Sequence, residues 1–190
     1  KNVFTSLLVS SKKVEKIIQH PLVRAVTLTG SEPAGSAVAA AAGKVIKPTV
    51  LELGGSDPYL ILEDADLEHA ATQCAESRLL NAGQSCIGAK RFIVLEKVYE
   101  EFMELFLEKM NAAKMGDPME EDTDIGPLAR PDLRKTLHED VQKSIKKGAR
   151  CLLGGSIPEG PGAFYPPTIL TNITKKMPAY HKEFFGPVAS

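Results

Sequence analysis

Short apolar runs alternate along the chain with stretches of helical periodicity, a pattern typical of α/β folds that contain parallel strands. In the first quarter of the sequence the runs are rich in β-branched residues and the intervening stretches place apolar residues on one helical face. This pattern predicts strands at 3–9, 25–28 and 47–53 and helices near 14–18 and 34–42.

A break follows at Gly54-Gly55-Ser56-Asp57-Pro58, because two glycines and a proline cannot continue a regular strand or helix. We therefore predict a domain boundary there, with residues 1–53 in one domain and 54–190 in the next. Beyond the break the pattern predicts strands at 59–62, 91–95 and 150–153, and helices after Asp66, at 98–110 and at 133–145.

The composition indicates a globular protein and argues against several binding classes. The chain has 190 residues, 43% of them hydrophobic, and its 23 Lys+Arg against 24 Asp+Glu give a formal charge of -1. A globular protein is expected, and the balanced charge argues against binding nucleic acid or an anionic membrane by bulk charge. No stretch approaches the roughly 20 apolar residues of a membrane span. Three cysteines without a disulfide or CxxC pattern predict a reducing, cytoplasmic setting.

Cys86 lies in a glycine-flanked turn, between Gly83 and Gly88 and ahead of the strand at 91–95. Glycines let a ligand approach the backbone closely, and a thiolate in such a turn can attack a carbonyl carbon. The alternative is that Cys86 is a small buried hydrophobe. Cys74, on an apolar helical face, and Cys151, in an apolar strand, are expected to be structural.

Glu52 interrupts an apolar strand immediately before Gly54, so its carboxylate is expected at a strand end among apolar neighbours. A partly desolvated carboxylate would suit proton abstraction, whereas an outward-pointing edge carboxylate is the alternative. The turn from Gly30 to Gly35 joins a strand to a helix N-terminus, which is a weak signal for an anion site. The four histidines lack ligand spacing and the Asp122 region lacks a calcium-loop glutamate, so no metal is predicted.

Three motifs, taken in order, resemble those of the aldehyde dehydrogenase superfamily. Residues 50–55 (VLELGG) look like its glutamate motif, residues 81–86 (NAGQSC) like its cysteine motif and residues 181–188 (HKEFFGPV) like its late glutamate–phenylalanine motif. The resemblance covers the whole chain but only the middle of the longer family sequence. It implies an α/β fold: the end of a Rossmann-type cofactor domain in 1–53 and most of a catalytic domain, with a mainly parallel sheet, in 54–190.

The resemblance also implies a chemistry. A thiolate at Cys86 attacks an aldehyde, hydride passes from the thiohemiacetal to NAD or NADP, and Glu52 activates the water that hydrolyses the resulting thioester. The backbone N–H of Cys86 forms half of an oxyanion hole. By the same resemblance the cofactor contacts fall on Gly30, Ser31, Leu53, Glu183 and Phe185.

Within the superfamily, residues 83–92 and 164–168 are most similar to bacterial succinate-semialdehyde dehydrogenases. Many of those enzymes carry an arginine six residues before the cysteine, where this chain has Leu80, and some carry a second cysteine where it has Gly88. The resemblance implies a homo-oligomeric parent enzyme and an inactive fragment. A CoA-acylating aldehyde dehydrogenase, a thiol esterase and a non-catalytic scaffold are the alternatives.

Overall fold

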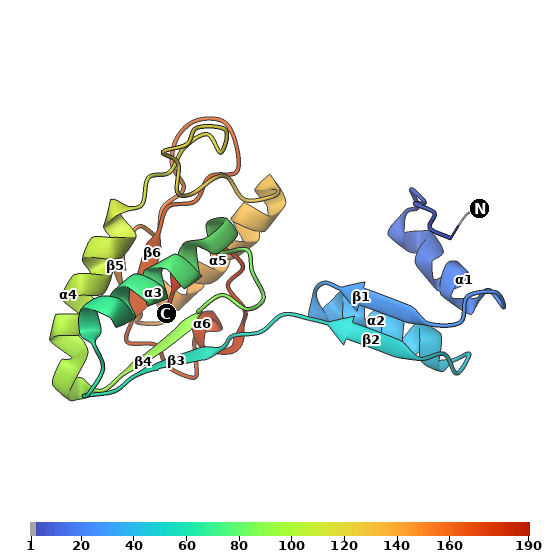
Figure 1. The fold of residues 1–190 in the computed structure, drawn as a ribbon, viewed down its shortest axis with the longest axis horizontal. Helices are drawn as coiled ribbons and strands as arrows, with labels where there is room; N and C mark the ends of the chain where they lie inside the picture. The colour runs from blue at the N-terminus through green and yellow to red at the C-terminus, as the bar shows by residue number, and fades with distance from the viewer. Residues whose placement is uncertain (1–2) are drawn as a thin grey trace. The chain divides into compact units, whose positions relative to one another are not determined.

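The computed structural model describes residues 3–190, and the chain divides into two compact units between Gly54 and Gly55 (Figure 1). The division falls within the glycine-rich break that the sequence marks as a boundary. The two units are described separately below. No helix among residues 3–190 is long and apolar enough to cross a membrane.

The first unit contains a parallel pair of strands packed against one helix, which a second, shorter helix contacts. After the short turn η1 (Ser11–Lys13) come α1 (Val14–Gln19), β1 (Val26–Thr29), α2 (Glu32–Gly43) and β2 (Thr49–Glu52). β1 and β2 pair in parallel, with Thr29 opposite Glu52. The small core joins Ile18 of α1 to Val38, Ala41 and Ala42 of α2. The alanine-rich face of α2 lets α1 approach it closely.

The strand expected at 3–9 is wrong. Residues 5–10 adopt no regular structure, and Phe4 and Leu8 are fully or almost fully exposed. An apolar run becomes a strand only when a neighbouring strand satisfies its N–H and C=O groups, and none of the described strands pairs with this segment. Local composition alone therefore misassigns it.

The second unit alternates strands and helices. Its elements are β3 (Pro58–Ile61), α3 (Leu67–Leu79), η2 (Leu80–Gly83), β4 (Arg91–Val94), α4 (Glu96–Ala112), α5 (Pro131–Lys146), β5 (Arg150–Leu153), β6 (Thr168–Thr171), α6 (Pro178–His181) and β7 (Val188–Ala189). The prediction that Asp66 caps α3 is confirmed, because its side chain accepts a hydrogen bond from the His69 N–H at 3.0 Å. The sequence pattern does not predict β6, α6 or β7.

The strands of this unit are mostly parallel. β3 pairs with β4 in parallel and β6 with β7 in parallel, whereas β5 pairs with β6 antiparallel. Ser190, just after β7, donates to the Lys90 carbonyl and accepts from the Phe92 N–H. These two bonds place the end of β7 beside the start of β4, so the two groups of strands meet edge to edge.

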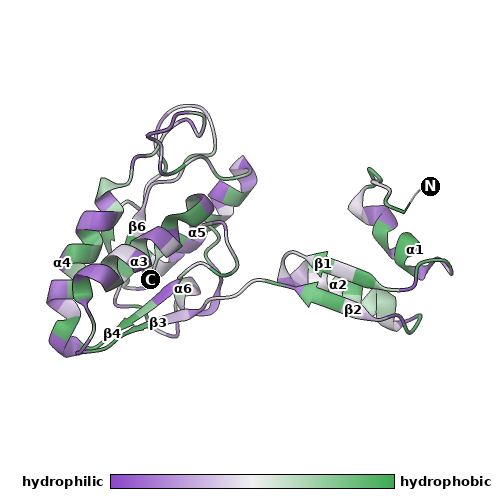
Figure 2. Ribbon diagram, in the orientation of Figure 1, coloured by the Kyte–Doolittle hydropathy of each residue, from purple (hydrophilic) through white to green (hydrophobic). Residues whose placement is uncertain are grey.

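The core of the second unit lies between the sheet and the helices α3, α4 and α5. Phe102 and Phe106 of α4 are buried and their rings stack 5.4 Å apart, and Val141 of α5 is also buried. The apolar stripe of α4 is visible beside its polar face in Figure 2. The amphipathic periodicity in the sequence therefore correctly identifies the inner faces of α4 and α5.

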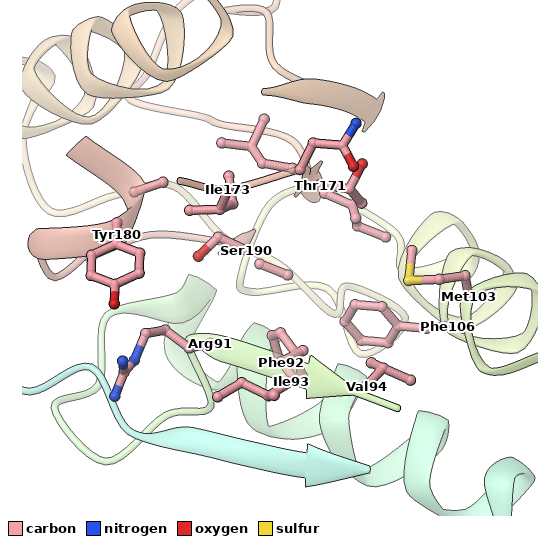
Figure 3. A pocket seen from close by; sticks show the side chains of 15 residues that line it. Arg91, Phe92, Ile93, Val94, Met103, Phe106, Thr171, Ile173, Tyr180 and Ser190 are labelled. Atoms are coloured by element: carbon pink, nitrogen blue, oxygen red, sulfur yellow. The ribbon is translucent and has the colours of Figure 1, made fainter. Parts of the chain in front are cut away.

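An apolar groove opens between β4 and β6, with a cavity volume of about 390 Å³ (Figure 3). Phe92 and Val94 line it from β4, Met103 and Phe106 line it from α4, and Ser190 also lines it. None of the predicted site residues lines this groove. It is therefore separate from the turn that carries Cys86.

Candidate active site

Cys86 lies on an irregular turn between α3 and β4. Asn81, Ala82 and Gly83 all have positive φ values, 53°, 54° and 73°, which reverse the chain immediately after the helix. The Gly88 N–H then donates to the Ser85 carbonyl at 3.3 Å, which closes a turn with Cys86 in its interior. The Cys86 thiol is exposed, so the expectation of an accessible cysteine here agrees with the structure.

Gly83 brings the cysteine turn into contact with the late motif. A Cβ atom at position 83 would lie 2.1 Å from the carbonyl oxygen of Gly186 and 2.6 Å from the nitrogen of Pro187. Only glycine combines the positive φ with this backbone approach. The cysteine motif (81–86) and the late motif (181–188) are therefore in direct contact through their main chains.

Side-chain hydrogen bonds fix both ends of the turn. The Asn81 and Gln84 side chains each donate to the other residue's carbonyl, at 3.0 and 3.1 Å, and the Gln84 side-chain oxygen accepts from the Ala129 N–H at 2.9 Å. At the far end the Ser77 hydroxyl accepts from the Ala89 N–H at 2.9 Å. The turn is thus tied to α3 and to the segment before α5.

Two buried cations lie beneath the turn, and sequence reasoning does not single out either of them. Lys90 is 2% exposed, and its ammonium donates to the carbonyls of Ser85, Cys86 and Gly88 at 2.8, 2.9 and 3.2 Å. Arg78 is fully buried and donates to the Gly83 carbonyl at 2.6 Å. The signal that could have found them is a pair of cations flanking the cysteine motif among small and apolar residues.

Glu183 of the late motif supplies the counter-charge. Its Oε1 lies 3.2 Å from the Lys90 Nζ, and the Glu183 side chain is 23% exposed. Burial lowers the pKa of Arg78 to about 10, and the negative charge of Glu183 opposes that shift. Arg78 therefore remains a cation at neutral pH, and Glu183 faces two buried positive charges.

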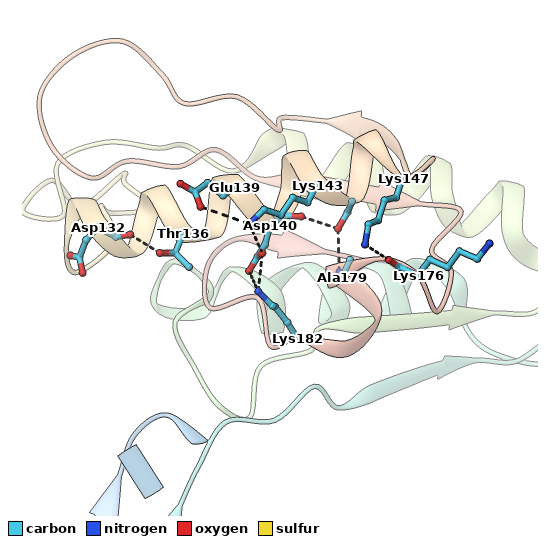
Figure 4. Close-up of polar contacts among 10 residues, drawn as sticks. Asp132, Thr136, Glu139, Asp140, Lys143, Lys147, Lys176, Ala179 and Lys182 are labelled. Carbon is cyan, nitrogen blue, oxygen red and sulfur yellow. Dashed lines mark hydrogen bonds and ion pairs between the residues drawn. The ribbon is translucent and has the colours of Figure 1, made fainter. Parts of the chain in front are cut away.

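The segment that carries Glu183 is anchored to α5 (Figure 4). Both carboxylate oxygens of Asp140 accept from the Lys182 ammonium, at 2.9 and 2.8 Å. The Ser144 hydroxyl accepts from the Ala179 N–H of α6 at 3.2 Å. Phe184, next to Glu183, is buried at 4% exposure, whereas Phe185 is 43% exposed. This anchoring leaves the Phe185 ring available to a ligand.

The other two cysteines have different surroundings. Cys74 is 3% exposed on α3, and burial raises its pKa to about 11. Cys151 is exposed on β5 rather than enclosed in the core, but its thiol donates to the Leu153 carbonyl at 3.2 Å and partial burial raises its pKa. The exposed thiol of Cys86 on its fixed turn is the better candidate nucleophile.

The remaining predicted residues belong to the first unit and lie around the ends of β1 and β2. Gly30 and Ser31 are exposed between β1 and α2, and the Gly30 N–H donates to the Glu52 carbonyl at 2.9 Å. Leu53 packs on α2, since a Cβ atom at Gly35 would lie 2.6 Å from its Cδ2. The structure thus brings Gly30 and Glu52 together, and brings Cys86 and Glu183 together within the other unit.

The apolar surroundings expected for Glu52 are not found. Its side chain is exposed at the end of β2, because alternate residues of the strand face opposite sides and Glu52 follows the exposed face that also carries Val50. The residues of this unit therefore do not desolvate the carboxylate. Among residues 3–190, no cluster of three or more His, Cys, Asp or Glu side chains is arranged to hold a metal.

The chain is similar to proteins of one family. The model of the aldehyde dehydrogenase family matches residues 1–190. Over 187 residues the chain is 52% identical to a succinate-semialdehyde dehydrogenase [NADP(+)] of Mycobacterium avium, covering 98% of the chain and 40% of that protein. The crystal structure of succinic semialdehyde dehydrogenase from Streptococcus pyogenes in complex with NADP+ matches with a TM-score of 0.93 and 42% identity, over 96% of the chain and 40% of that structure.

A second solved structure is also similar to the chain. Lactaldehyde dehydrogenase from Escherichia coli matches with a TM-score of 0.89 and 38% identity, over 92% of the chain and 37% of that structure. The chain thus spans about 40% of the length of the curated relatives it matches. Because the family model covers all of its residues, the chain belongs to the aldehyde dehydrogenase family.

Proposed function

We propose that the protein catalyses the NAD(P)-dependent oxidation of an aldehyde to a carboxylic acid, with Cys86 as nucleophile and Glu52 as general base. The observation that carries the proposal is the exposed Cys86 thiol on a turn that packs directly against the late motif through Gly83. Family membership supports the reaction class. In this proposal residues 1–53 are the C-terminal part of a cofactor-binding domain and residues 54–190 belong to the catalytic domain.

The chemistry begins with the Cys86 thiolate, whose sulfur bonds to the carbonyl carbon of the aldehyde and leaves a negative charge on the oxygen. Within residues 3–190 the Cys86 N–H meets no acceptor, so it is free to donate to that oxygen. Loss of hydride converts the adduct to a thioester. Water activated by Glu52 then adds to the thioester carbon, the C–S bond breaks, and the acid leaves with the thiol restored.

Residues in both units are suited to a nicotinamide cofactor, which supplies a hydride acceptor when bound. Ser31 is the N-cap of α2 but makes no side-chain cap bond, so the first N–H groups of this 12-residue helix are open to phosphate oxygens. Glu183 presents a partly exposed carboxylate that can accept from a ribose hydroxyl, and Phe185 presents an exposed ring. Gly30 and Leu53 complete the proposed set of contacts.

Succinate semialdehyde is the substrate we propose, on the strength of the 52% identity to an enzyme named for it. A substrate carboxylate needs a cation or several donors, and Leu80, which is 57% exposed beside the turn, can supply neither. The group that holds the carboxylate must therefore be another residue. If a neutral aldehyde of equal length reacts as well as succinate semialdehyde, the substrate assignment is wrong while the reaction class stands.

The test is aldehyde-dependent formation of NADH or NADPH by the intact protein and two cysteine variants. Cys86→Ser is expected to abolish turnover, and Cys151→Ser, which alters the other exposed thiol, is expected to retain it. Turnover that survives Cys86→Ser would refute the proposal. Glu52→Gln is expected to slow release of the carboxylic acid. If an acyl product forms only when CoA is added, the enzyme is a CoA-acylating aldehyde dehydrogenase instead.

A further inference from the structure

Lys90 is placed where an isolated charge is costly, yet four oxygen atoms surround its ammonium group. The side chain is 2% exposed, three carbonyl oxygens of the cysteine turn lie within 3.2 Å of Nζ, and Glu183 Oε1 lies at 3.2 Å. An ammonium has three protons to donate, and the three carbonyls accept all of them. These three hydrogen bonds bring the carbonyls of Ser85, Cys86 and Gly88 together around one ammonium group.

Two of the three carbonyls belong to peptide groups that include Cys86. The Ser85 carbonyl shares its peptide plane with the Cys86 N–H, and the Cys86 carbonyl shares its plane with the Ile87 N–H. A positive charge 2.8 Å from the Ser85 oxygen draws electron density toward that oxygen and makes the Cys86 N–H a stronger donor. The same contact fixes the direction in which this N–H points.

We propose that Lys90 is a positioning residue of the active site: through the Ser85–Cys86 peptide group it orients and polarises the Cys86 N–H that stabilises the oxyanion. The inference rests on the proposed function, because it takes Cys86 as the nucleophile. Lys90 touches neither substrate nor cofactor in this account. Its pairing with Glu183 additionally fixes the distance between the cysteine turn and the late motif.

The test compares two reactions of the same thiol in the intact protein. Iodoacetamide alkylates Cys86 by displacement of iodide at an sp³ carbon, so no oxyanion forms. p-Nitrophenyl acetate acylates it: the sulfur bonds to the carbonyl carbon and an oxyanion forms. The oxyanion then collapses, the bond between the acyl carbon and the phenolic oxygen breaks, and p-nitrophenolate leaves with the electron pair. Only the second reaction needs the Cys86 N–H as an oxyanion donor.

The variants are chosen to distinguish a loss of the Lys90 positioning role from a general loss of folding. Lys90→Met alone leaves Glu183 without its partner, so Lys90→Met/Glu183→Gln is compared with Glu183→Gln. Lys109 and Glu68 form a more exposed lysine–glutamate pair elsewhere in the same unit, and Lys109→Met/Glu68→Gln serves as the control for removing such a pair. Far-UV circular dichroism and the accessibility of the buried Cys74 thiol verify that each variant is folded.

Removing Lys90 in the Glu183→Gln background is expected to slow acylation by about tenfold or more, while alkylation changes little, because removal of a complete oxyanion donor costs about 10²–10³-fold. The Lys109 control is expected to change neither rate. Equal loss in both reactions would mean that Lys90 only supports the thiol, and no loss would mean that it has no role at the site; either result overturns the inference. Acylation that persists in Cys86→Ser would instead refute the proposed function.

Discussion

Replacing Gly83 by alanine tests the contact on which the candidate site depends. The added methyl group meets the Gly186 carbonyl oxygen at 2.1 Å and the Pro187 nitrogen at 2.6 Å, both main-chain atoms that cannot move aside like a flexible side chain. The positive φ of 73° adds a backbone penalty of about 1–2 kcal/mol. Overpacking of a well-packed site costs a further ~1–3 kcal/mol, so Gly83→Ala is expected to lower the free energy of unfolding of the second unit by about 2–5 kcal/mol.

The matched control is Gly160→Ala. Gly160 also has a positive φ, 106°, but a Cβ atom there would meet nothing within 4 Å, so this variant carries the backbone penalty without the clash. Alkylation of the buried Cys74 thiol as a function of urea concentration measures unfolding of the second unit specifically. If Gly83→Ala is no less stable than Gly160→Ala, the close contact between the cysteine turn and the late motif is wrong.

Three further predictions concern stability. Burial raises the pKa of Cys74 from 9.0 to about 11, so between these pH values the folded state keeps a proton that the unfolded state loses. The free energy of unfolding is therefore expected to be constant below pH 9 and to fall by up to about 3 kcal/mol as the pH rises through 11. Cys74→Ala removes this component, and identical pH dependence of the unfolding free energy in both proteins would contradict the burial of the thiol. Phe102→Ala is expected to cost about 3–5 kcal/mol by urea denaturation, and Leu60→Ala, at a side chain 64% exposed, little; similar losses would show that the core is misplaced. Lys182→Met, which leaves the Asp140 carboxylate at 9% exposure without its 2.8 Å partner, is expected to cost about 1–3 kcal/mol, and adding Asp140→Asn should recover part of that loss, whereas additive losses would argue against the pair.

The sequence predicts those parts of the fold that depend on local patterns. Asp66 is a helix cap whose partner lies three residues away, and the stripe of α4 with Phe102 and Phe106 follows helical spacing, so neighbouring residues suffice to define both. The break at Gly54-Gly55 is equally local. The cap and the stripe are found where the pattern places them, and residues 53–57 form neither strand nor helix.

Features that depend on distant partners are not predicted. β6 becomes a strand because β5 and β7 lie on either side of it, and the run from Val3 to Val9 forms no strand because none of the described strands pairs with it. The role of Lys90 depends on a turn that folds three carbonyl oxygens around its ammonium. Glycine flanks predict that Cys86 is accessible, whereas the two cations that flank the cysteine motif do not by themselves reveal that both are buried beneath the turn.

The most direct test of the central claim is to trap the acyl group on the protein. The intact Glu52→Gln variant is incubated with succinate semialdehyde and NADP+, digested, and each cysteine peptide is examined by mass spectrometry. The account predicts that the acyl group accumulates on Cys86 and not on Cys74 or Cys151, because Cys86 attacks the aldehyde and the slowed general base leaves the thioester intact. NADPH formation with no acyl group on Cys86, or with the acyl group on another cysteine, would contradict it.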